Sequence, residues 1–293
     1  MPIAAVNGLE LFFDVRGPDD GVPVLLVMGL GAQYQAWDHD FVAALTDRGF
    51  RVVRYDNRDV GESSRIPAGD VAIGDQLLAA FSGGEVKPPY LLSDMAADAV
   101  GLLDHLDIPA AHVVGASMGG MIAQTLAIEH PDRVLTLTSI MSTTGDPDVG
   151  TPSPEAMGVL LRPQAADRET AIEQRVEAGR IIGSPEHFDE AKVRAQAAES
   201  YDRGYYPVGV GQQLLAVLGS GSRTEALRSI DVPTLVVHGA IDPLVNVTGG
   251  KRTAEAVPGA ELLLIDDMGH DLPAVHWPQI VEAITQLASK VKA

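Results

Sequence analysis

The stretch from His112 to Gly120, HVVGASMGG, constrains the fold of this chain more than any other. Its apolar first half predicts a buried strand, and Met118–Glu129 has the pattern of a helix. Ser117 therefore stands at the turn from strand to helix, in the pattern Gly115-x-Ser117-x-Gly119. Such a turn holds the serine in a sparsely populated backbone conformation, and glycines on both sides leave room for it. The same pattern also arises by chance and can serve close packing alone, so its meaning depends on the rest of the chain.

Short apolar runs alternate with helical patterns along most of the chain. The first two runs flank Asn7-Gly8, a strong signal for a two-residue hairpin. The alternation is typical of a mostly parallel sheet with helices on both faces. Residues 65–89 are rich in glycine and proline with little periodicity, and we expect a long surface excursion there. The predicted strands comprise residues 3–6, 9–15, 23–28, 50–55, 108–114, 134–140, 234–238 and 261–265.

This rhythm changes after residue 142. A polar linker rich in proline and glycine comes first, and residues 155–225 then have the pattern of three or four helices without a convincing strand. The sheet pattern resumes at Pro233, so the helical stretch is an insertion between two strands. The predicted domains are a core of residues 1–142 and 226–293 and a helical insertion of residues 143–225.

Composition excludes several classes of function. The chain has 293 residues, of which 46% are hydrophobic, so it is long enough to bury a large core. A formal net charge of −19 disfavours nucleic acid and anionic membrane surfaces as partners. There is no cysteine, which rules out a thiol nucleophile, a disulfide and a thiolate metal site. The first residues lack the basic start of a secretory signal, so we expect a soluble, cytoplasmic protein; its oligomeric state is left open.

A serine becomes a good nucleophile only with a base in reach and a third group to orient that base. In parallel sheets such groups gather on loops after the carboxyl ends of strands. Two of these loops offer Asp242 and His270, in the chain order serine, acid, histidine. The alternatives are a turn aspartate before a proline and a solvated loop histidine. Asp266 and Asp267 are fallback acids, but they are close to His270 in sequence for reaching its far ring nitrogen.

The developing oxyanion of such a reaction needs hydrogen-bond donors. The helix that starts after Ser117 supplies the N–H of Met118. The loop Gly29-Leu30-Gly31 follows a predicted strand and can supply a second donor, which we assign to Leu30. A plain glycine turn is the alternative interpretation of this loop.

The sequence predicts neither a metal nor a cofactor. It contains no H-x-H or H-E-x-x-H motif, no carboxylate cluster with metal spacing and no glycine-rich phosphate loop. Two other histidines lie in predicted strands and are expected in the core, namely His112 and His238. The rest fall on predicted helices or their ends and are expected at the surface: His39, His105, His130, His187 and His276.

Together these residues resemble the α/β-hydrolase superfamily over nearly the whole chain. Residues 115–120 resemble its nucleophile elbow, residues 239–243 its acid loop and residues 268–270 its histidine loop. The resemblance implies an α/β-hydrolase fold, a mostly parallel sheet with a helical cap inserted after the sixth strand. It also implies structural roles for Asp56 and Arg58, in the turn after the fourth strand.

Three segments resemble the aclacinomycin methylesterase group more narrowly: residues 26–29, 54–63 and 268–273. Enzymes of that group cleave a methyl ester from a polyketide-derived aromatic compound. One feature departs from the wider superfamily, because Met28-Gly29 stands where a His-Gly pair is usual before the oxyanion residue. A histidine-based arrangement of that loop is therefore absent, whereas the backbone donor is unaffected.

The resemblance also implies that the insertion covers the active site. Apolar side chains of the insertion then serve both to pack the cap and to line an acyl or aromatic pocket. As a group they favour a neutral, apolar small-molecule ester over an anionic one, as the negative net charge does. The candidate pocket residues are Met141, Leu160, Leu161, Tyr205, Tyr206, Leu214 and Leu215.

Three functional hypotheses follow. The first is a serine carboxylic ester hydrolase, working through Ser117, His270 and Asp242 and an acyl-enzyme, without a cofactor. The second uses the same triad for C–C bond hydrolysis of a diketone or for cofactor-free perhydrolysis. The third is a non-catalytic receptor or scaffold that has kept the fold. The intact set of three side chains favours an enzyme.

Overall fold

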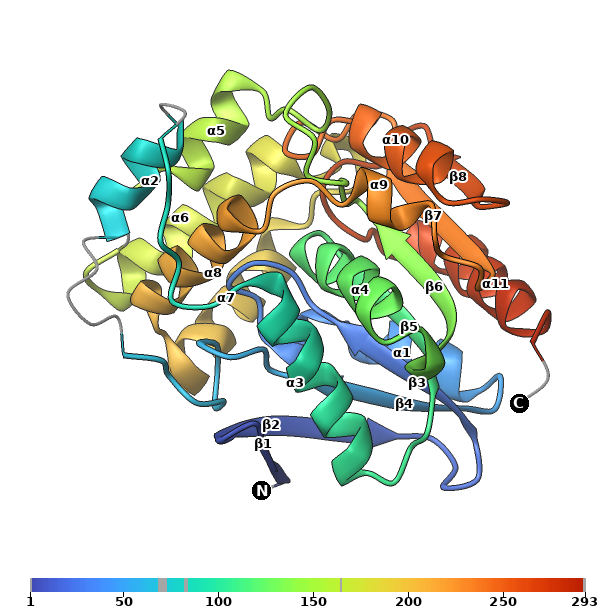
Figure 1. Cartoon of the computed structure of the whole chain (residues 1–293). Helices are drawn as coiled ribbons and strands as arrows, with labels where there is room; N and C mark the ends of the chain where they lie inside the picture. The colour runs from blue at the N-terminus through green and yellow to red at the C-terminus, as the bar shows by residue number, and fades with distance from the viewer. Residues whose placement is uncertain (1, 68–72, 82–83, 164, 292–293) are drawn as a thin grey trace.

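Figure 1 shows a twisted sheet with helices on both of its faces. The computed structural model describes residues 2–67, 73–81, 84–163 and 165–291. Its eight strands pair in the order β1-β2-β4-β3-β5-β6-β7-β8; β2 is antiparallel to both neighbours, and the other pairs are parallel. The predicted mostly parallel sheet is therefore confirmed. The strands are β1 (Ile3–Val6), β2 (Leu9–Arg16), β3 (Val22–Val27), β4 (Phe50–Tyr55), β5 (Ala111–Ala116), β6 (Val134–Ile140), β7 (Thr234–Gly239) and β8 (Glu261–Ile265).

The helices on the two faces of the sheet belong to separate hydrophobic clusters. One cluster holds α3 (Leu92–His105) and α4 (Met118–Glu129), together with Ala256 at the end of α10 (Thr248–Ala256). The other holds α1 (His39–Thr46) and α11 (Trp277–Ala288). No helix among the described residues is both long enough and apolar enough to span a membrane.

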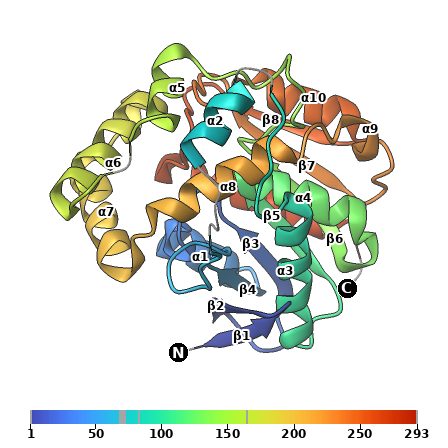
Figure 2. The ribbon, with the colours of Figure 1, turned by 60° about the vertical axis from the view of Figure 1, so that its left-hand side comes forward.

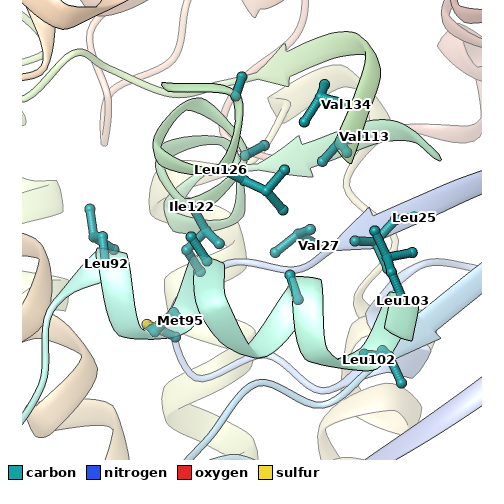
Figure 3. Close-up of a cluster of buried hydrophobic side chains, with 14 of the residues drawn as sticks. Leu25, Val27, Leu92, Met95, Leu102, Leu103, Val113, Ile122, Leu126 and Val134 are labelled. Atoms are coloured by element: carbon teal, nitrogen blue, oxygen red, sulfur yellow. The ribbon is translucent and has the colours of Figure 1, made fainter. Parts of the chain in front are cut away.

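The packing of α4 fixes the position of its amino-terminal end. Ile122 and Leu126 of α4 point toward Val27 of β3 and Val113 of β5, with Leu103 of α3 beside them (Figure 3). All five side chains are completely buried. Burial of aliphatic side chains at this density makes any displacement of the helix costly. The first turn of α4 is thereby held rigidly at the end of β5.

Strand order also determines where a site can form. β4 pairs with one side of β3, and β5, the next strand in the chain, pairs with its other side. The chain therefore reverses its direction of winding between β3 and β5. In open α/β sheets, ligand sites lie outside the carboxyl ends of the strands at such a reversal. The segments that leave this point are the loop after Val27 and the turn at Ser117.

The described residues between β6 and β7 form five α-helices and one short 3-10 helix and contain no strand. The four longer helices gather beyond the carboxyl ends of the central strands (Figures 1 and 2). This agrees with the helical character predicted for the insertion; its boundaries at residues 143 and 225 stay a prediction. The helices are α5 (Pro154–Leu160), α6 (Arg168–Ile182), α7 (Glu190–Gly204), α8 (Pro207–Gly219) and α9 (Thr224–Leu227).

The surface excursion predicted for residues 65–89 contains a helix that its low periodicity did not indicate. Ile73–Phe81 forms the helix α2, which packs beside α8 (Figure 2). A Cβ atom on Gly211 of α8 would lie only 2.6 Å from Cγ2 of Ile73, so the two backbones approach closely. A short helix like this depends on tertiary packing, which a local pattern does not reveal. Residues 68–72 and 82–83 of the excursion lie outside the described part of the chain.

The turn after β4 has the structural roles that the resemblance implied. The Asp56 carboxylate is buried, accepts the backbone N–H groups of Tyr34 (2.8 Å) and Glu62 (3.0 Å), and pairs with Arg203 of α7 (2.6 Å). Arg58 donates two hydrogen bonds to Asp98 of α3, at 2.7 and 2.8 Å. Buried charges of this kind persist only when paired. The turn thus joins the helical insertion and α3 to the sheet.

Acid should destabilise the fold through His112 of β5. Burial lowers the pKa of His112 to about 4, against about 6.5 in an unfolded chain. The folded state therefore binds fewer protons between these values, and stability falls as pH drops from 6.5 toward 4. We expect this histidine to account for a loss of about 3 kcal/mol, which His112→Asn removes. Urea unfolding between pH 7 and pH 4 measures it: a constant difference between variant and wild type would contradict the expectation.

Candidate active site

The turn that carries Ser117 has the strained geometry predicted from its glycines. Ser117 adopts φ 57° and ψ −121°, a conformation that few residues with side chains tolerate. A Cβ atom on Gly115 would lie 2.1 Å from the carbonyl oxygen of Gly119. One on Gly119 would lie 2.1 Å from the carbonyl oxygen of Val27. Both positions therefore admit only glycine, and their role in the turn is confirmed.

Backbone contacts hold the serine at the end of the sheet. The N–H of Ser117 donates to the carbonyl of Ile140 at the end of β6 (2.9 Å), and its own carbonyl accepts the Ser142 hydroxyl (2.9 Å). The Ser117 side chain forms no capping hydrogen bond to α4. Its hydroxyl is therefore free to face the loops that follow the neighbouring strands.

The structure brings the three predicted side chains into one chain of hydrogen bonds. His270 Nε2 lies 3.0 Å from Ser117 Oγ, and His270 Nδ1 lies 2.7 Å from Asp242 Oδ2. The other carboxylate oxygen of Asp242 accepts the backbone N–H groups of Leu244 (2.8 Å) and Val245 (2.9 Å). The Asp242 side chain is fully buried, and that of His270 is 8% exposed. The carboxylate is thus fixed by the backbone and faces the ring with one oxygen.

His238, which was expected in the core, is fully buried beside this carboxylate. Its Nε2 lies 2.8 Å from the carbonyl of Val245 and 3.6 Å from Asp242 Oδ2. Burial lowers the pKa of His238, so the ring is neutral and its Nε2–H donates to the carbonyl. Of the two histidines beside Asp242, His270 is therefore the one whose positive charge the carboxylate stabilises after proton transfer to the ring.

The loop that carries His270 is attached to the helical insertion. The backbone N–H of His270 donates to the carbonyl of Ile182 at the end of α6 (2.7 Å). The Ser184 hydroxyl accepts the N–H of Gly269 (2.8 Å) and donates to the Asp271 carboxylate (2.5 Å). The ring position therefore depends on residues more than eighty positions earlier in the chain. The sequence pattern around β8 predicts that His270 lies in a loop, but it does not predict these contacts with the insertion.

The two predicted oxyanion donors belong to segments next to the serine. A Cβ atom on Gly29 would lie 3.1 Å from Cβ of Ser117, so the loop after β3 passes directly beside the serine. Within the described residues, the backbone N–H groups of Leu30 and Met118 have no hydrogen-bond partner. The next N–H, that of Gly31, is already engaged by the side chain of Gln213 (2.8 Å). Two N–H groups next to Ser117 thus remain free for a ligand.

Two residues of α8 that the sequence analysis did not single out support this loop. Gln213 is fully buried and also donates from its amide to the carbonyl of Arg58 (2.8 Å). Val210 lies against Gly31, where an added Cβ would come within 2.9 Å of its Cγ2. The sequence signal was a glutamine pair inside an otherwise apolar helix, Gln212-Gln213. A buried polar group on such a helix requires a specific partner.

The non-aromatic residues predicted to line a pocket differ in how deeply they are buried. Met141 is buried directly after β6 and has a positive φ of 43°. Leu214 and Leu215 are buried in α8. Leu160 is half-buried at the end of α5, and Leu161 is 47% exposed. Their contact with a substrate stays a prediction.

The two candidate pocket tyrosines are half-buried and already have partners. The Tyr205 hydroxyl donates to the carbonyl of Ala165 (2.9 Å). The Tyr206 ring lies 4.7 Å below the guanidinium carbon of Arg65. The role of both rings in a pocket also stays a prediction.

One histidine prediction is wrong. His276, expected at the surface, is only 7% exposed in the short helical turn η4 (Ala274–His276). It lies there between Asp267 and Gln279, and His187 of the insertion approaches the same carboxylate. These three ionisable groups come from separate segments, so local spacing could not reveal the cluster. Asp242, rather than the fallback acids Asp266 and Asp267, is the carboxylate that contacts His270.

The family model of the α/β-hydrolase fold matches residues 22–276. The chain belongs to this family. Two rhodomycin D methylesterases are each 32% identical to this hydrolase: that of Streptomyces peucetius over 95% of both chains and that of Streptomyces sp. (strain C5) over 92% of both. The enol-lactonase from Burkholderia xenovorans LB400 has the same fold, with a TM-score of 0.75 over 98% of this chain and 100% of that chain at 24% identity. The resemblance to the methylesterase group is thereby confirmed, and this α/β hydrolase is a carboxylesterase-type enzyme.

Proposed function

We propose that this hydrolase cleaves a methyl ester of a neutral, apolar carboxylic acid, with Ser117 as nucleophile, His270 as base and Asp242 as the orienting acid. The observation that carries the proposal is the unbroken chain of contacts from Ser117 Oγ through the His270 ring to Asp242, at 3.0 and 2.7 Å. Hydrogen-bond reach between nucleophile and base, with the base held by a third group, is the arrangement that activates a serine.

The geometry supports a two-step reaction. His270 Nε2 takes the proton of Ser117 Oγ as the oxygen attacks the ester carbonyl, and Asp242 stabilises the resulting imidazolium. The proton then passes to the leaving alcohol as the C–O bond breaks, which leaves an acyl group on Ser117. Water attacks this acyl-enzyme with His270 again as base, releases the acid and restores the serine.

The oxyanion of each tetrahedral intermediate requires donors beside the serine. The free N–H groups of Leu30, in the loop beside Ser117, and of Met118, the next residue in the chain, are the donors in this proposal. Such a donor typically contributes about 3–4 kcal/mol to transition-state binding. Because both are backbone groups, the absence of a histidine before Gly29 does not affect them.

The proposed substrate class rests on the relatives and on charge. The two similar methylesterases act on rhodomycin D according to their names. A net charge of −19 disfavours an anionic acid, and the α8 side chains Leu214 and Leu215 are apolar. A neutral ester with an aromatic or aliphatic acyl part and a small alcohol fits these observations.

Initial rates on a matched panel of esters test the proposal. The panel combines methyl, ethyl and butyl esters of one aromatic acid with the methyl ester of the same acid carrying a second, ionised carboxylate. We expect the neutral methyl ester to be hydrolysed fastest and methanol to appear in equal amount with the acid. Faster turnover of a vinylogous diketone, or of peroxide with acetate, would instead favour the C–C hydrolase or perhydrolase alternative.

Loss of the Gln213 amide should weaken catalysis without removing it. In Gln213→Met the N–H of Gly31 loses its acceptor, and an unsatisfied buried N–H costs about 1–3 kcal/mol. The loop should relax to satisfy this N–H, which displaces the neighbouring Leu30 donor and weakens transition-state stabilisation. We therefore expect kcat to fall about tenfold with little change in KM. Steady-state kinetics measure this. Gln212→Met, one residue away on the same helix, is the matched control, and an equal effect there would contradict a specific role for Gln213.

A further inference from the structure

A second cluster of ionisable side chains lies next to the catalytic histidine loop. It combines His187 of the turn η3 (Pro185–His187), Asp267 after β8 and His276 of η4. One ligand atom from each residue lies within 4.8 Å of the other two. The proposed ester hydrolysis uses none of these side chains. Within the described residues they make up the only such group of three.

The geometry of the cluster is that of converging ligands. His187 Nε2 lies 2.7 Å from Asp267 Oδ2, and His276 Nε2 lies 3.0 Å from Asp267 Oδ1. The two imidazole rings are nearly perpendicular, with centroids 5.2 Å apart. Ligand atoms around a tetrahedral Zn²⁺ at bond lengths of about 2.0–2.2 Å lie roughly 3.3 Å from one another. The nitrogen–oxygen separations of 2.7 and 3.0 Å are shorter than this and run to different oxygens of Asp267, so the two imidazoles must move apart slightly to admit an ion.

His276 supplies an independent indication of a ligand. Its side chain is 91% buried, and its Nε2 is buried without a hydrogen-bond partner among the described residues. Asp267 Oδ1 is near enough in distance, but the approach lacks the direction that a hydrogen bond requires. A buried nitrogen left unsatisfied in this way is uncommon and calls for a partner. A cation between the two imidazoles and the carboxylate is such a partner.

The surroundings of the cluster also suit a metal ligand. The amide of Gln279 lies 3.0 Å from His276 Nδ1. With the amide turned by half a rotation, its oxygen accepts the Nδ1 proton and leaves the Nε2 lone pair for a metal. Asp267 is 41% exposed and His187 is 24% exposed, so an ion can enter from solvent and keep a water as fourth ligand. Two imidazoles and one carboxylate favour Zn²⁺ over Ca²⁺ or Mg²⁺.

We propose that His187, Asp267 and His276 bind one Zn²⁺ ion, which fastens the helical insertion to the loop of the catalytic histidine. Asp267 lies three residues before His270, and His187 lies three residues after Ser184, which contacts Gly269. The site therefore joins the same two segments that the Ser184 and Ile182 hydrogen bonds already connect. The ion is structural: it stabilises the junction and leaves the chemistry to Ser117.

Zinc titration of the chelator-treated, dialysed full-length protein tests the proposal. Calorimetry should show one ion bound per chain, and saturating ZnSO₄ should raise the unfolding midpoint by at least about 3 °C. His187→Gln keeps a polar side chain of similar reach but removes one ligand. We expect it to weaken zinc binding at least about tenfold and to abolish most of the thermal shift. His276→Gln should do the same if it folds; the half-exposed position 187 keeps the test decisive if it does not.

His39→Gln is the matched control, because His39 is also a helix-end histidine beside an aspartate, Asp40, but is 80% exposed. It should bind zinc as the wild type does. A wild type whose midpoint does not respond to zinc would overturn the proposal, as the cluster would then be a metal-free ion pair. A shift of equal size in His187→Gln would overturn it too, because the ion would bind elsewhere, as at His270. Neither result would affect the proposed ester hydrolysis, which the ester panel tests separately.

Discussion

Ser117→Ala should lower kcat for an aryl ester by at least about 10³-fold, because the variant loses the only atom proposed to attack the carbonyl. The residual rate should reflect substrate binding and the free N–H groups of Leu30 and Met118. Alanine has the same Cβ at φ 57°, so backbone strain at the turn is unchanged. The unfolding midpoint should therefore stay close to that of the wild type. Release of p-nitrophenol from a p-nitrophenyl ester measures the rate.

Ser142→Ala is the matched control for this experiment. Its hydroxyl is also next to the turn, where it donates to the carbonyl of Ser117, but it does not contact His270. We expect it to keep most of the activity. A fluorophosphonate should label the wild type and not Ser117→Ala. Near-full activity of Ser117→Ala would contradict the nucleophile assignment, and failure of the wild type to react would favour a non-catalytic protein.

The contact between the three side chains of the proposed triad was predictable because each of them has a local signal. The two glycines around Ser117 indicate the turn, because a Cβ atom added to either of them would clash with a backbone carbonyl oxygen. Asp242 and His270 each follow an apolar run at the carboxyl end of a strand, where a parallel sheet collects functional groups. Strand order then brings the three loops together, because the carboxyl ends of strands that are distant in the chain lie at one edge of the sheet. The family resemblance and the local residue patterns both predict the same three side chains.

The features that the sequence did not reveal all depend on contacts between distant segments. α2 is a short helix that packs on α8, and its glycine- and proline-rich neighbours conceal it. Gln213 matters because of Gly31, which lies 182 residues away in the chain. His187 approaches Asp267 across 80 residues, so no spacing rule finds the pair. Such contacts depend on how the helical insertion packs against the core, and hydrophobic periodicity along the sequence does not predict this packing.

Asp242→Asn is expected to lower kcat by about 10⁴-fold, the cost of a wrong histidine tautomer in a serine hydrolase. The buried side chain cannot rotate freely, because Asp242 Oδ1 accepts the N–H groups of Leu244 and Val245. An asparagine keeps its oxygen there and therefore turns its NH₂ group toward His270 Nδ1. The ring must then accept at Nδ1 and carry its proton on Nε2, where it can no longer take the proton of Ser117. The fold should tolerate the change, because both backbone hydrogen bonds survive.

Asp266→Asn is the control, since Asp266 is an exposed carboxylate on the histidine loop without contact to the ring. Its kcat should stay within a few-fold of the wild type, whereas Asp242→Asn should lose activity with an almost unchanged unfolding midpoint. The nitrogen chemical shifts of the His270 ring would report the tautomer directly. A proton still on Nδ1 in Asp242→Asn, or a larger loss of activity in Asp266→Asn, would show that Asp242 is not the group that orients the base.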